Sequence, residues 1–302
     1  MKILVTGSAG FIGSHLVEQL AKAGHDITGM DIMFPKSVCD SFVDDIRYLE
    51  PRGGIALANS SFEACIHAAA SPDVRGVNPE LTWSTNVDGT RRLLDALPAS
   101  CTRFVFLSSS CVYGHDDEPL WVGQATERQL WPVSLYGASK LAGEGLVSVW
   151  AARDPFRRWS AIRPVTVYGA RYARGHIKDF VDQARTSGGA PITALDDGSQ
   201  QKDGVHVLDL CDAVQYALEQ VEAGAIDVAG GSWSWRDTAR VMGIHVLPGD
   251  AREGFVGDAR RVTGFDCRRL RGYGWSPKRS CEGGVRETLD SLGWSKKREG
   301  RQ

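Results

Sequence analysis

Long apolar runs are missing from this sequence. No segment approaches the roughly 20 unbroken apolar residues that a membrane-spanning helix needs. Three glycines interrupt the apolar opening MKILVTGSAGFIGSHL and no longer apolar stretch follows, so we do not expect a secretory signal there. The sequence therefore predicts a soluble globular protein with no membrane partner.

The cysteines lack the spacing of a structural framework. Seven are scattered along the chain, an odd number with no C-x-x-C pair and no histidine at ligand spacing. Neither a disulfide framework nor a zinc site is indicated, so we expect no metal and a reducing, cytoplasmic location. A strong charge is lacking as well. The formal net charge of −2 gives no reason to expect nucleic acid as a partner.

Short apolar runs alternate regularly with longer amphipathic ones in the first half of the chain. The 302 residues, 42% of them hydrophobic, are enough to bury a sizeable core. Such alternation predicts parallel strands joined by right-handed crossovers, which make a doubly wound α/β sheet with helices on both faces. The expected strands are 2–6, 26–30, 64–67, 103–107 and 160–163, and the expected helices are 11–23, 79–97 and 136–152.

The regular pattern loosens after Pro164. We therefore predict a larger α/β domain over 1–165, to which segments near 203–230 return, and a smaller α/β lobe over 166–302. The clearest elements expected in the second part are helices near 177–187 and 208–221 and a short strand at 225–228.

Glycines occupy positions 7, 10 and 13, between the first expected strand and the first expected helix. A turn at Gly7, Gly10 and Gly13 lets a pyrophosphate approach the backbone N–H groups at the helix N-terminus. Asp31 ends the second expected strand, 18 residues after Gly13. Its carboxylate can accept both hydroxyls of an adenosine ribose and would repel a 2′-phosphate, so the sequence favours NAD over NADP.

Several motifs then occur in a fixed order: TGxxGxxG at 6–13, the pair Asp45-Ile46, HAAA at 67–70, Asn86 in TNVDGT, and Tyr136-Gly-Ala-Ser-Lys140. Together they resemble the extended short-chain dehydrogenases/reductases, a family of sugar-nucleotide epimerases and dehydratases. The resemblance extends to the Leu270…Gly274-Trp275…Pro277 pattern near the end.

This resemblance implies a Rossmann fold that binds NAD in the larger domain, with the smaller lobe binding a nucleotide-diphosphate sugar. It also implies a homodimer through the helices that carry Leu93-Leu94 and 141–147. His67 is expected to be a packed residue at a strand end. The cofactor contacts that the resemblance implies are Phe11 and Ile12 along the pyrophosphate, Asp45 and Ile46 at the adenine, and Ala68, Ala69, Ala70, Asn86, Tyr136 and Lys140 elsewhere.

Tyr136 and Lys140 are four residues apart on an expected helix, so both lie on one face. A phenol with a pKa near 10 is a poor base at neutral pH, and an ammonium beside it stabilises the phenolate. In the family that this sequence resembles, such a tyrosine takes a proton from a sugar hydroxyl, and the lysine also holds the cofactor ribose. Glu144, one turn further, is expected to be an i,i+4 partner of Lys140.

The stretch SSSCVYG at 108–114 follows an expected strand, at the sheet edge where ligands bind in this fold. Ser109 matches the family's Ser or Thr that shares the reacting oxygen with the tyrosine. The resembling dehydratases carry Asp-Glu at the next two positions. This sequence has Ser110-Cys111 instead, which disfavours a 4,6-dehydratase.

Cys111 has two interpretations, which the sequence leaves open. In most epimerases of the family this position packs under the nicotinamide. In GDP-fucose synthases and related 3,5-epimerases the cysteine is a general acid or base, and His176 can be aligned with the histidine that those enzymes use. A thiol can serve as a carbon base if a neighbouring cation lowers its pKa. Those synthases use NADP, however, whereas Asp31 favours NAD.

Three residues match substrate-binding positions of the family: Thr166, Lys202 and Arg252. Thr166 replaces an asparagine, and Lys202 replaces an arginine and so loses its bidentate fork. Our interpretation is an NAD-dependent sugar-nucleotide epimerase, acting at C4. The alternative is a 3,5-epimerase or 4-ketoreductase that uses Cys111 and His176, and a more remote alternative is an inactive NAD-binding regulator.

Overall fold

The structure is a computed structural model. Among the residues that it describes, no helix is both long and apolar enough to cross a bilayer. Asp45, Ile46 and Arg252 lie outside the described residues, so their predicted roles stay predictions. The described residues are 1–33, 40–43, 57, 60–113, 130–172, 174–188, 191–195, 198–199, 201–220, 223–249, 265 and 267–294.

A seven-stranded sheet, parallel throughout, forms the larger part of the described structure. From β1 the chain adds strands β2 and β3 on one side and then continues with β4, β5, β6 and β10 on the other side, as in a doubly wound fold. The predicted doubly wound α/β fold is therefore confirmed. From edge to edge the strands are β10 (Ala223–Val228), β6 (Arg158–Pro164), β5 (Arg103–Leu107), β4 (Ala64–His67), β1 (Lys2–Thr6), β2 (Asp26–Asp31) and β3 (Asp40–Val43).

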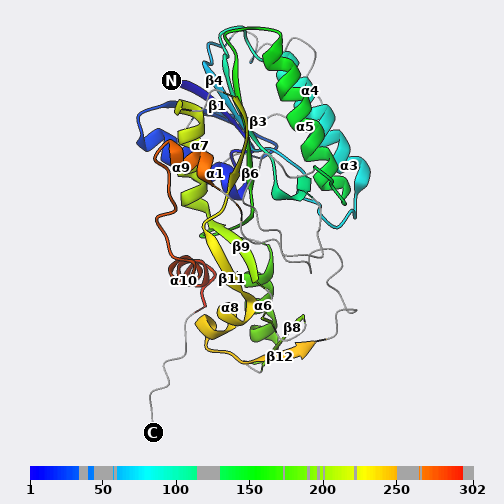
Figure 1. Cartoon of the computed structure of the whole chain (residues 1–302), viewed down its shortest axis with the longest axis vertical. Helices are drawn as coiled ribbons and strands as arrows, with labels where there is room; N and C mark the ends of the chain where they lie inside the picture. Colours follow the sequence, from blue (N-terminus) through cyan, green and yellow to red (C-terminus); the bar gives the residue numbers. More distant parts are fainter. Residues whose placement is uncertain are drawn as a thin grey trace.

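Helices cover both faces of this sheet (Figure 1). On one face, α1 (Phe11–Lys22) packs against α7 (Val207–Gln220). On the other, α4 (Thr90–Ala96) packs against α5 (Leu135–Ala152). The sheet therefore has one apolar core on each side, and its inner strands are apolar along almost their whole length.

The segment predicted as one helix over 79–97 consists of three pieces. Its start follows local chemistry, because the Asn78 side chain accepts a hydrogen bond from the Leu81 N–H at 3.1 Å and Pro79 occupies the first turn. Sequence periodicity alone does not distinguish such a helix from a continuous one. The pieces are α3 (Pro79–Trp83), a π-helical turn over Ser84–Gly89, and α4.

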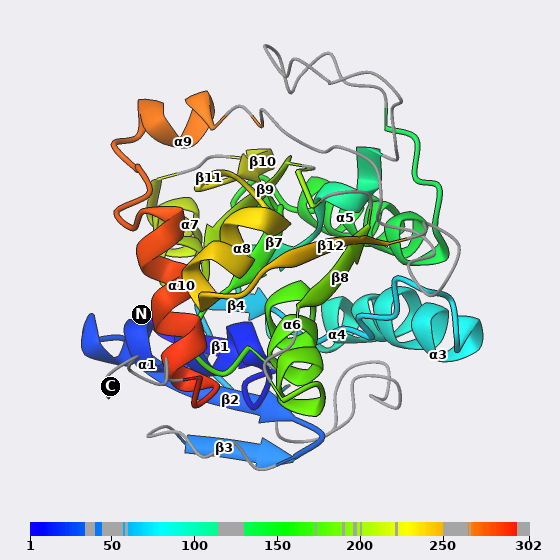
Figure 2. The same cartoon turned by 90° about the horizontal axis from the view of Figure 1, so that it is seen from below.

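The smaller lobe lies beyond the lower end of the large sheet in Figure 1 and is seen end-on in Figure 2. A cluster of aromatic rings, among them Tyr168, Trp233 and Trp235, fills its centre. One sheet has the order β11 (Gly231–Ser234), β9 (Gln201–His206), β7 (Thr166–Tyr168), a second pairs β12 (Val246–Gly249) with β8 (Ile192–Leu195), and the helices are α6 (His176–Thr186), α8 (Trp235–Met242) and α10 (Cys281–Ser291).

The chain returns to the larger core after entering the smaller lobe. Strand β10 extends the large sheet beside β6, and α7 covers it. Leu270 of α9 (Arg268–Gly272) and Trp275 are also buried in that core. The domain boundary at 165/166 and the returning segments near 203–230 stay predictions.

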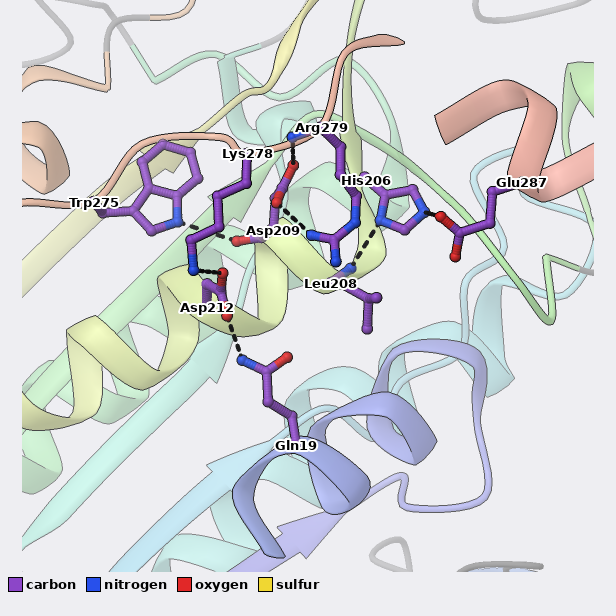
Figure 3. A network of polar contacts seen from close by, with 9 residues as sticks. All are labelled: Gln19, His206, Leu208, Asp209, Asp212, Trp275, Lys278, Arg279 and Glu287. Atoms are coloured by element: carbon purple, nitrogen blue, oxygen red, sulfur yellow. Dashed lines mark hydrogen bonds and ion pairs between the residues drawn. The ribbon is translucent and has the colours of Figure 1, made fainter. Parts of the chain in front are cut away.

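A polar network ties the C-terminal segment to the helices of the larger part (Figure 3). The Asp212 carboxylate accepts hydrogen bonds from Gln19 of α1 at 2.6 Å and from Lys278 at 2.7 Å. The buried Asp209 carboxylate pairs with Arg279 at 2.8 Å. This network fixes the segment between Trp275 and α10 across the ends of α1 and α7.

Candidate active site

The glycine-rich turn between β1 and α1 packs against the backbone that follows β4. Gly7 has a φ of +71°, and a Cβ there would lie 2.6 Å from the Ala69 nitrogen. A Cβ at Gly13 would lie 2.0 Å from the Gly7 carbonyl oxygen. Ala68 and Ala69 run beside the turn, where their N–H groups donate to Thr6 at 3.1 and 3.3 Å. A larger side chain would fill this cradle, so the residues present fit a closely approaching pyrophosphate.

Asp31 is at the end of β2, next to this turn. Its carboxylate accepts hydrogen bonds from the Ala9 N–H at 2.9 Å and from the Met33 N–H at 3.2 Å. The carboxylate is thereby held beside the glycine turn, where a ribose would be recognised. Phe11 begins α1, and its ring meets Tyr172 edge-on at 5.7 Å, so the turn is also packed against the chain that leads to the smaller lobe.

His67 is a packed residue, as expected. Its ring is buried between the hydroxyls of Thr6 at 2.6 Å and Thr90 at 3.0 Å. Burial, with a smaller effect of the charge of Lys140, lowers the pKa of His67 to about 3. The ring is therefore neutral at pH 7 and serves to join β1, β4 and α4.

Asn86 lies in the π-helical turn and is buried. Its carbonyl oxygen accepts from the Ser71 N–H at 2.7 Å, and its amide nitrogen donates to the Ser71 carbonyl at 3.1 Å and to the Ser139 hydroxyl at 3.0 Å. The amide thus holds the chain after β4 to α5. These bonds engage both ends of the amide, so Asn86 orders the chain around the predicted cofactor site, and its contact with the cofactor stays a prediction.

Tyr136 and Lys140 share one face of α5, whose first turn is capped by the Ser134 hydroxyl. Burial raises the pKa of Tyr136, the charge of Cys111 raises it further, and a hydrogen bond with the Ser109 side chain lowers it. Lys140 is buried; its ammonium donates to the Leu107 carbonyl at 2.7 Å and lies 5.8 Å from the centroid of the Tyr136 ring. Burial lowers the pKa of Lys140 to about 8, against the opposing charges of Cys111 and Glu144.

Cys111 lies in the short 3-10 turn Ser110–Tyr113 that follows β5. Its N–H donates to the Ser109 hydroxyl at 3.1 Å, and a Cβ at Gly137 would lie 2.4 Å from its carbonyl oxygen. The structure therefore brings together Ser109, Cys111, Tyr136 and Lys140, although they come from two segments of the chain.

His176 occupies a different place, at the start of α6 in the smaller lobe. Its ring stacks on Trp235 at 6.3 Å and meets Trp233 edge-on at 5.5 Å. Burial, followed by the charge of Lys202, lowers the pKa of His176 to about 3. Its described contacts group it with Lys202 and the aromatic cluster, and its pairing with Cys111 stays a prediction.

The two described substrate-lobe candidates, Thr166 and Lys202, lie on neighbouring strands. Thr166 of β7 pairs with Gly204 of β9, two residues after Lys202. The Lys202 side chain is buried, with its ammonium 5.3 Å from the centre of the Trp235 ring. Lys202 thus lies inside the smaller lobe against an indole, and its role in phosphate binding stays a prediction.

Glu144 has a different partner from the one expected. Its carboxylate forms a bidentate ion pair with Arg163 of β6, at 2.6 and 2.9 Å, and accepts a hydrogen bond from Ser108 at 2.5 Å. It acts on Lys140 through its charge alone. Sequence reasoning missed this pair, although an arginine within the apolar run of β6 is a signal of a buried partner.

The glycine turn with Asp31 and the group around Tyr136 both follow strands of the parallel sheet and lie at its carboxyl edge. The first fits a dinucleotide, and the second brings a phenol, a hydroxyl and an ammonium together at the same edge. These features agree with comparisons to known proteins. The sequence profile of the NAD dependent epimerase/dehydratase family matches residues 3–229.

Relatives of the chain carry epimerase names. A UDP-glucose 4-epimerase of Corynebacterium glutamicum is 29% identical, over 92% of this chain and 91% of its own. The uncharacterised UDP-glucose epimerase YtcB of Bacillus subtilis is 31% identical over 72% of each chain.

Solved structures are similar as well. MoeE5 in complex with UDP-glucose and NAD superposes with a TM-score of 0.83 at 28% identity, over 97% of this chain and 99% of its own. A UDP-galactose 4-epimerase gives a TM-score of 0.79 at 27% identity, with the same coverage. The chain belongs to the NAD dependent epimerase/dehydratase family and is an NAD-dependent enzyme.

Proposed function

We propose that the chain is an epimerase of a nucleotide-diphosphate sugar and that it acts at C4 through a transient 4-keto sugar. The observation that carries this proposal is the Tyr136 hydroxyl, which shares a hydrogen bond with Ser109 and has the Lys140 ammonium behind its ring. The names of the relatives, UDP-glucose 4-epimerase and UDP-galactose 4-epimerase, support the same carbon and substrate class.

In this mechanism NAD, held by Gly7, Gly10, Gly13 and Asp31, supplies the hydride acceptor and donor. Tyr136 takes the proton from the C4 hydroxyl and returns it after the sugar has turned over. Ser109 donates to the same oxygen and relays the proton. The hydrogen bond from Ser109 opposes the rise in pKa that burial imposes on Tyr136, and a positive charge on Lys140 beside the ring would favour the phenolate.

The smaller lobe holds the nucleotide diphosphate in this proposal. Lys202 provides a buried cation for phosphate, Thr166 a hydroxyl on the neighbouring strand, and Arg252 a further cation. A homodimer through α4 and α5 belongs to the same proposal. Leu93, Leu94 and Val147 themselves are buried in the core of one chain, so other residues of these helices would make the contact.

A second candidate, a 3,5-epimerase or 4-ketoreductase, is favoured by one observation. Cys111 is close enough to Tyr136 and Lys140 for its charge to raise the pKa of both. A thiolate there could remove a proton from a carbon beside a keto group. It would act without His176, which is packed among the rings of the smaller lobe.

Turnover of a panel of sugar nucleotides in heavy water separates a C4 epimerase from a 3,5-epimerase. A C4 epimerase returns the hydride that it removed, so its product carries no carbon-bound deuterium. Abstraction of a proton at C3 or C5 incorporates deuterium at that carbon, and this result would overturn the C4 assignment. If the chain converts no sugar nucleotide and releases no NAD on denaturation, these results would instead support the inactive regulator.

A further inference from the structure

Leu107 at the end of β5 and the two serines that follow it each contact one residue of α5. Their partners are four residues apart along the helix, so they share one face. The contacts are the Lys140 ammonium with the Leu107 carbonyl at 2.7 Å, the Ser108 hydroxyl with the Glu144 carboxylate at 2.5 Å, and the Ser109 side chain with Tyr136.

Two glycines allow α5 to approach this segment closely. A Cβ at Gly137 would lie 2.4 Å from the Cys111 carbonyl oxygen, and a Cβ at Gly143 would lie 2.4 Å from the Phe106 ring. The helix is therefore seated on β5 and the following turn without room for larger side chains. In such a close-packed contact, a shift of one partner must move the other.

The segment 109–113 consists of Ser109 and the 3-10 turn with Cys111, and from here on we call it the turn. Glu144 and Arg163 contact both of its ends. Glu144 accepts the hydroxyl of Ser108, directly before the turn. Arg163 donates to the Tyr113 hydroxyl at 2.6 Å, at the end of the turn. Tyr113 in turn donates to the buried Asp227 of β10 at 2.8 Å.

The pair itself is almost inaccessible to water, since each side chain is 8% exposed. Buried charges are costly unless they are paired and hydrogen-bonded, and replacing such a pair by apolar residues is often neutral or stabilising. Stability is thus a weak reason for placing an ion pair here. The contacts of the Glu144–Arg163 pair with both ends of the turn give a more specific reason for its presence.

We propose that Glu144 and Arg163 are positioning residues of the reaction centre, which hold the turn carrying Ser109 and Cys111 at its distance from Tyr136. The link to catalysis rests on the proposed function, in which Ser109 and Tyr136 share the reacting oxygen. The positioning itself is a property of the fold and can be measured without turnover.

The first measurement is the alkylation rate of Cys111 in the NAD-bound enzyme, followed peptide by peptide by mass spectrometry. Ser108→Ala removes the link before the turn without changing any charge, and Glu144→Gln weakens it by replacing the carboxylate with a neutral amide. We expect both to accelerate labelling of Cys111 by about tenfold, while the fully buried Cys65 and Cys211 keep their wild-type rates. Asp95→Asn, in the exposed Arg91–Asp95 pair, is the control and should change nothing.

Three results would overturn the proposal. They are an unchanged Cys111 rate in both variants, acceleration in Glu144→Gln alone, which would indicate an effect of charge on the thiol, and acceleration of all three cysteines together, which would indicate a general loss of stability.

The second measurement is steady-state kinetics with whichever sugar nucleotide the wild type converts. We expect both variants to lower kcat by roughly tenfold to a hundredfold, with KM and NAD content unchanged, because a small displacement of reacting groups costs rate rather than binding. A rise in KM with unchanged kcat would contradict the proposal. If the wild type converts no sugar nucleotide, the proposed function fails, whereas the labelling result still decides the positioning.

Discussion

Burial acts in opposite directions on the two residues that carry the proposed chemistry. It raises the pKa of Tyr136 and lowers that of Lys140 to about 8, so it disfavours the charged form of each. An ammonium close to a phenol favours the phenolate, so in the proposed mechanism the protonation of Tyr136 depends on that of Lys140. The proposed catalytic base is Tyr136 with Lys140 beside its ring, and Ser109 is the hydroxyl that shares the proton.

At this scale we predict that Tyr136→Phe lowers kcat by about 10²- to 10⁴-fold, because the variant lacks the group that moves the proton. NAD should still be released on denaturation, since the glycine turn and Asp31 are intact. Tyr273→Phe changes an exposed tyrosine and should keep wild-type activity. Turnover by Tyr136→Phe within a few-fold of the wild type would rule out this tyrosine as the base.

The buried His67 gives a prediction for pH. Its pKa is about 3 in the folded chain against an ordinary value of 6.5, so between these values the unfolded chain binds a proton that the folded chain does not. The free energy of unfolding should consequently fall on acidification below pH 6.5, and His67 contributes about 1.4 kcal/mol per pH unit to that slope.

Urea unfolding at a series of pH values tests this contribution. His67→Gln keeps an amide between Thr6 and Thr90. In this variant the free energy of unfolding should depend less steeply on pH, by the contribution of about one proton. His245→Gln changes an exposed ring and should follow the wild-type slope. Equal slopes in His67→Gln and the wild type would contradict the buried, neutral state of His67.

At the scale of elements, close approach of backbone decides where the site forms. The glycine turn fits against Ala68 and Ala69 because Gly7 lacks a side chain, and α1 fits against the turn because Gly13 lacks one. Helix α5 similarly approaches Cys111 and Phe106 at Gly137 and Gly143. The glycine turn and α5 thus both depend on glycines that allow a close approach to the neighbouring chain.

Gly13→Ala should abolish NAD binding, because its Cβ would lie 2.0 Å from the Gly7 carbonyl oxygen and the turn would have to move. The measurement is NAD bound per chain after purification and after incubation with excess NAD. The matched control is Gly145→Ala on α5, where a Cβ meets nothing within 4 Å and alanine should stabilise the helix by roughly 0.5–1 kcal/mol. Full NAD occupancy in Gly13→Ala would refute the role of this turn.

At the scale of the whole molecule, the C-terminal segment is fastened to the larger part by the network in Figure 3. Trp275 is buried in the same core as Leu270, and its indole N–H donates to the Asp209 carbonyl at 3.1 Å. The Asp209 carboxylate is 1% exposed and pairs with Arg279. This arrangement holds α10 of the smaller lobe at a fixed place relative to α7.

Arg279→Met should therefore lower the free energy of unfolding by about 2 kcal/mol, because it leaves the Asp209 carboxylate buried without its ion pair. The effect is smaller than for a fully buried pair, since the Arg279 side chain is 32% exposed. Arg286→Met removes a pair in which both side chains are exposed and should cost clearly less than Arg279→Met. Urea unfolding measures both, and equal losses would contradict the importance of the buried carboxylate.

The sequence by itself determined the glycine turn with Asp31 and the shared face of Tyr136 and Lys140. It also determined the strands and helices of the larger part, except β3 and the division of 79–97 into three pieces. These are local features, because the period of apolar residues and the need for small residues in a turn act over a few neighbours. The elements of the smaller lobe were weaker in the sequence, since β7 and β11 are short and β9 contains Lys202, Asp203 and Gly204.

Only the tertiary structure decided which partner each polar side chain takes. It paired Glu144 with Arg163 instead of Lys140, placed His176 among the rings of the smaller lobe, and turned the amide of Asn86 to Ser71 and Ser139. Each of these contacts joins residues that are distant along the chain or lie on opposite sides of an element. The physical reason is that a buried polar group must find a partner wherever the packed fold offers one, and spacing along the sequence does not record that choice.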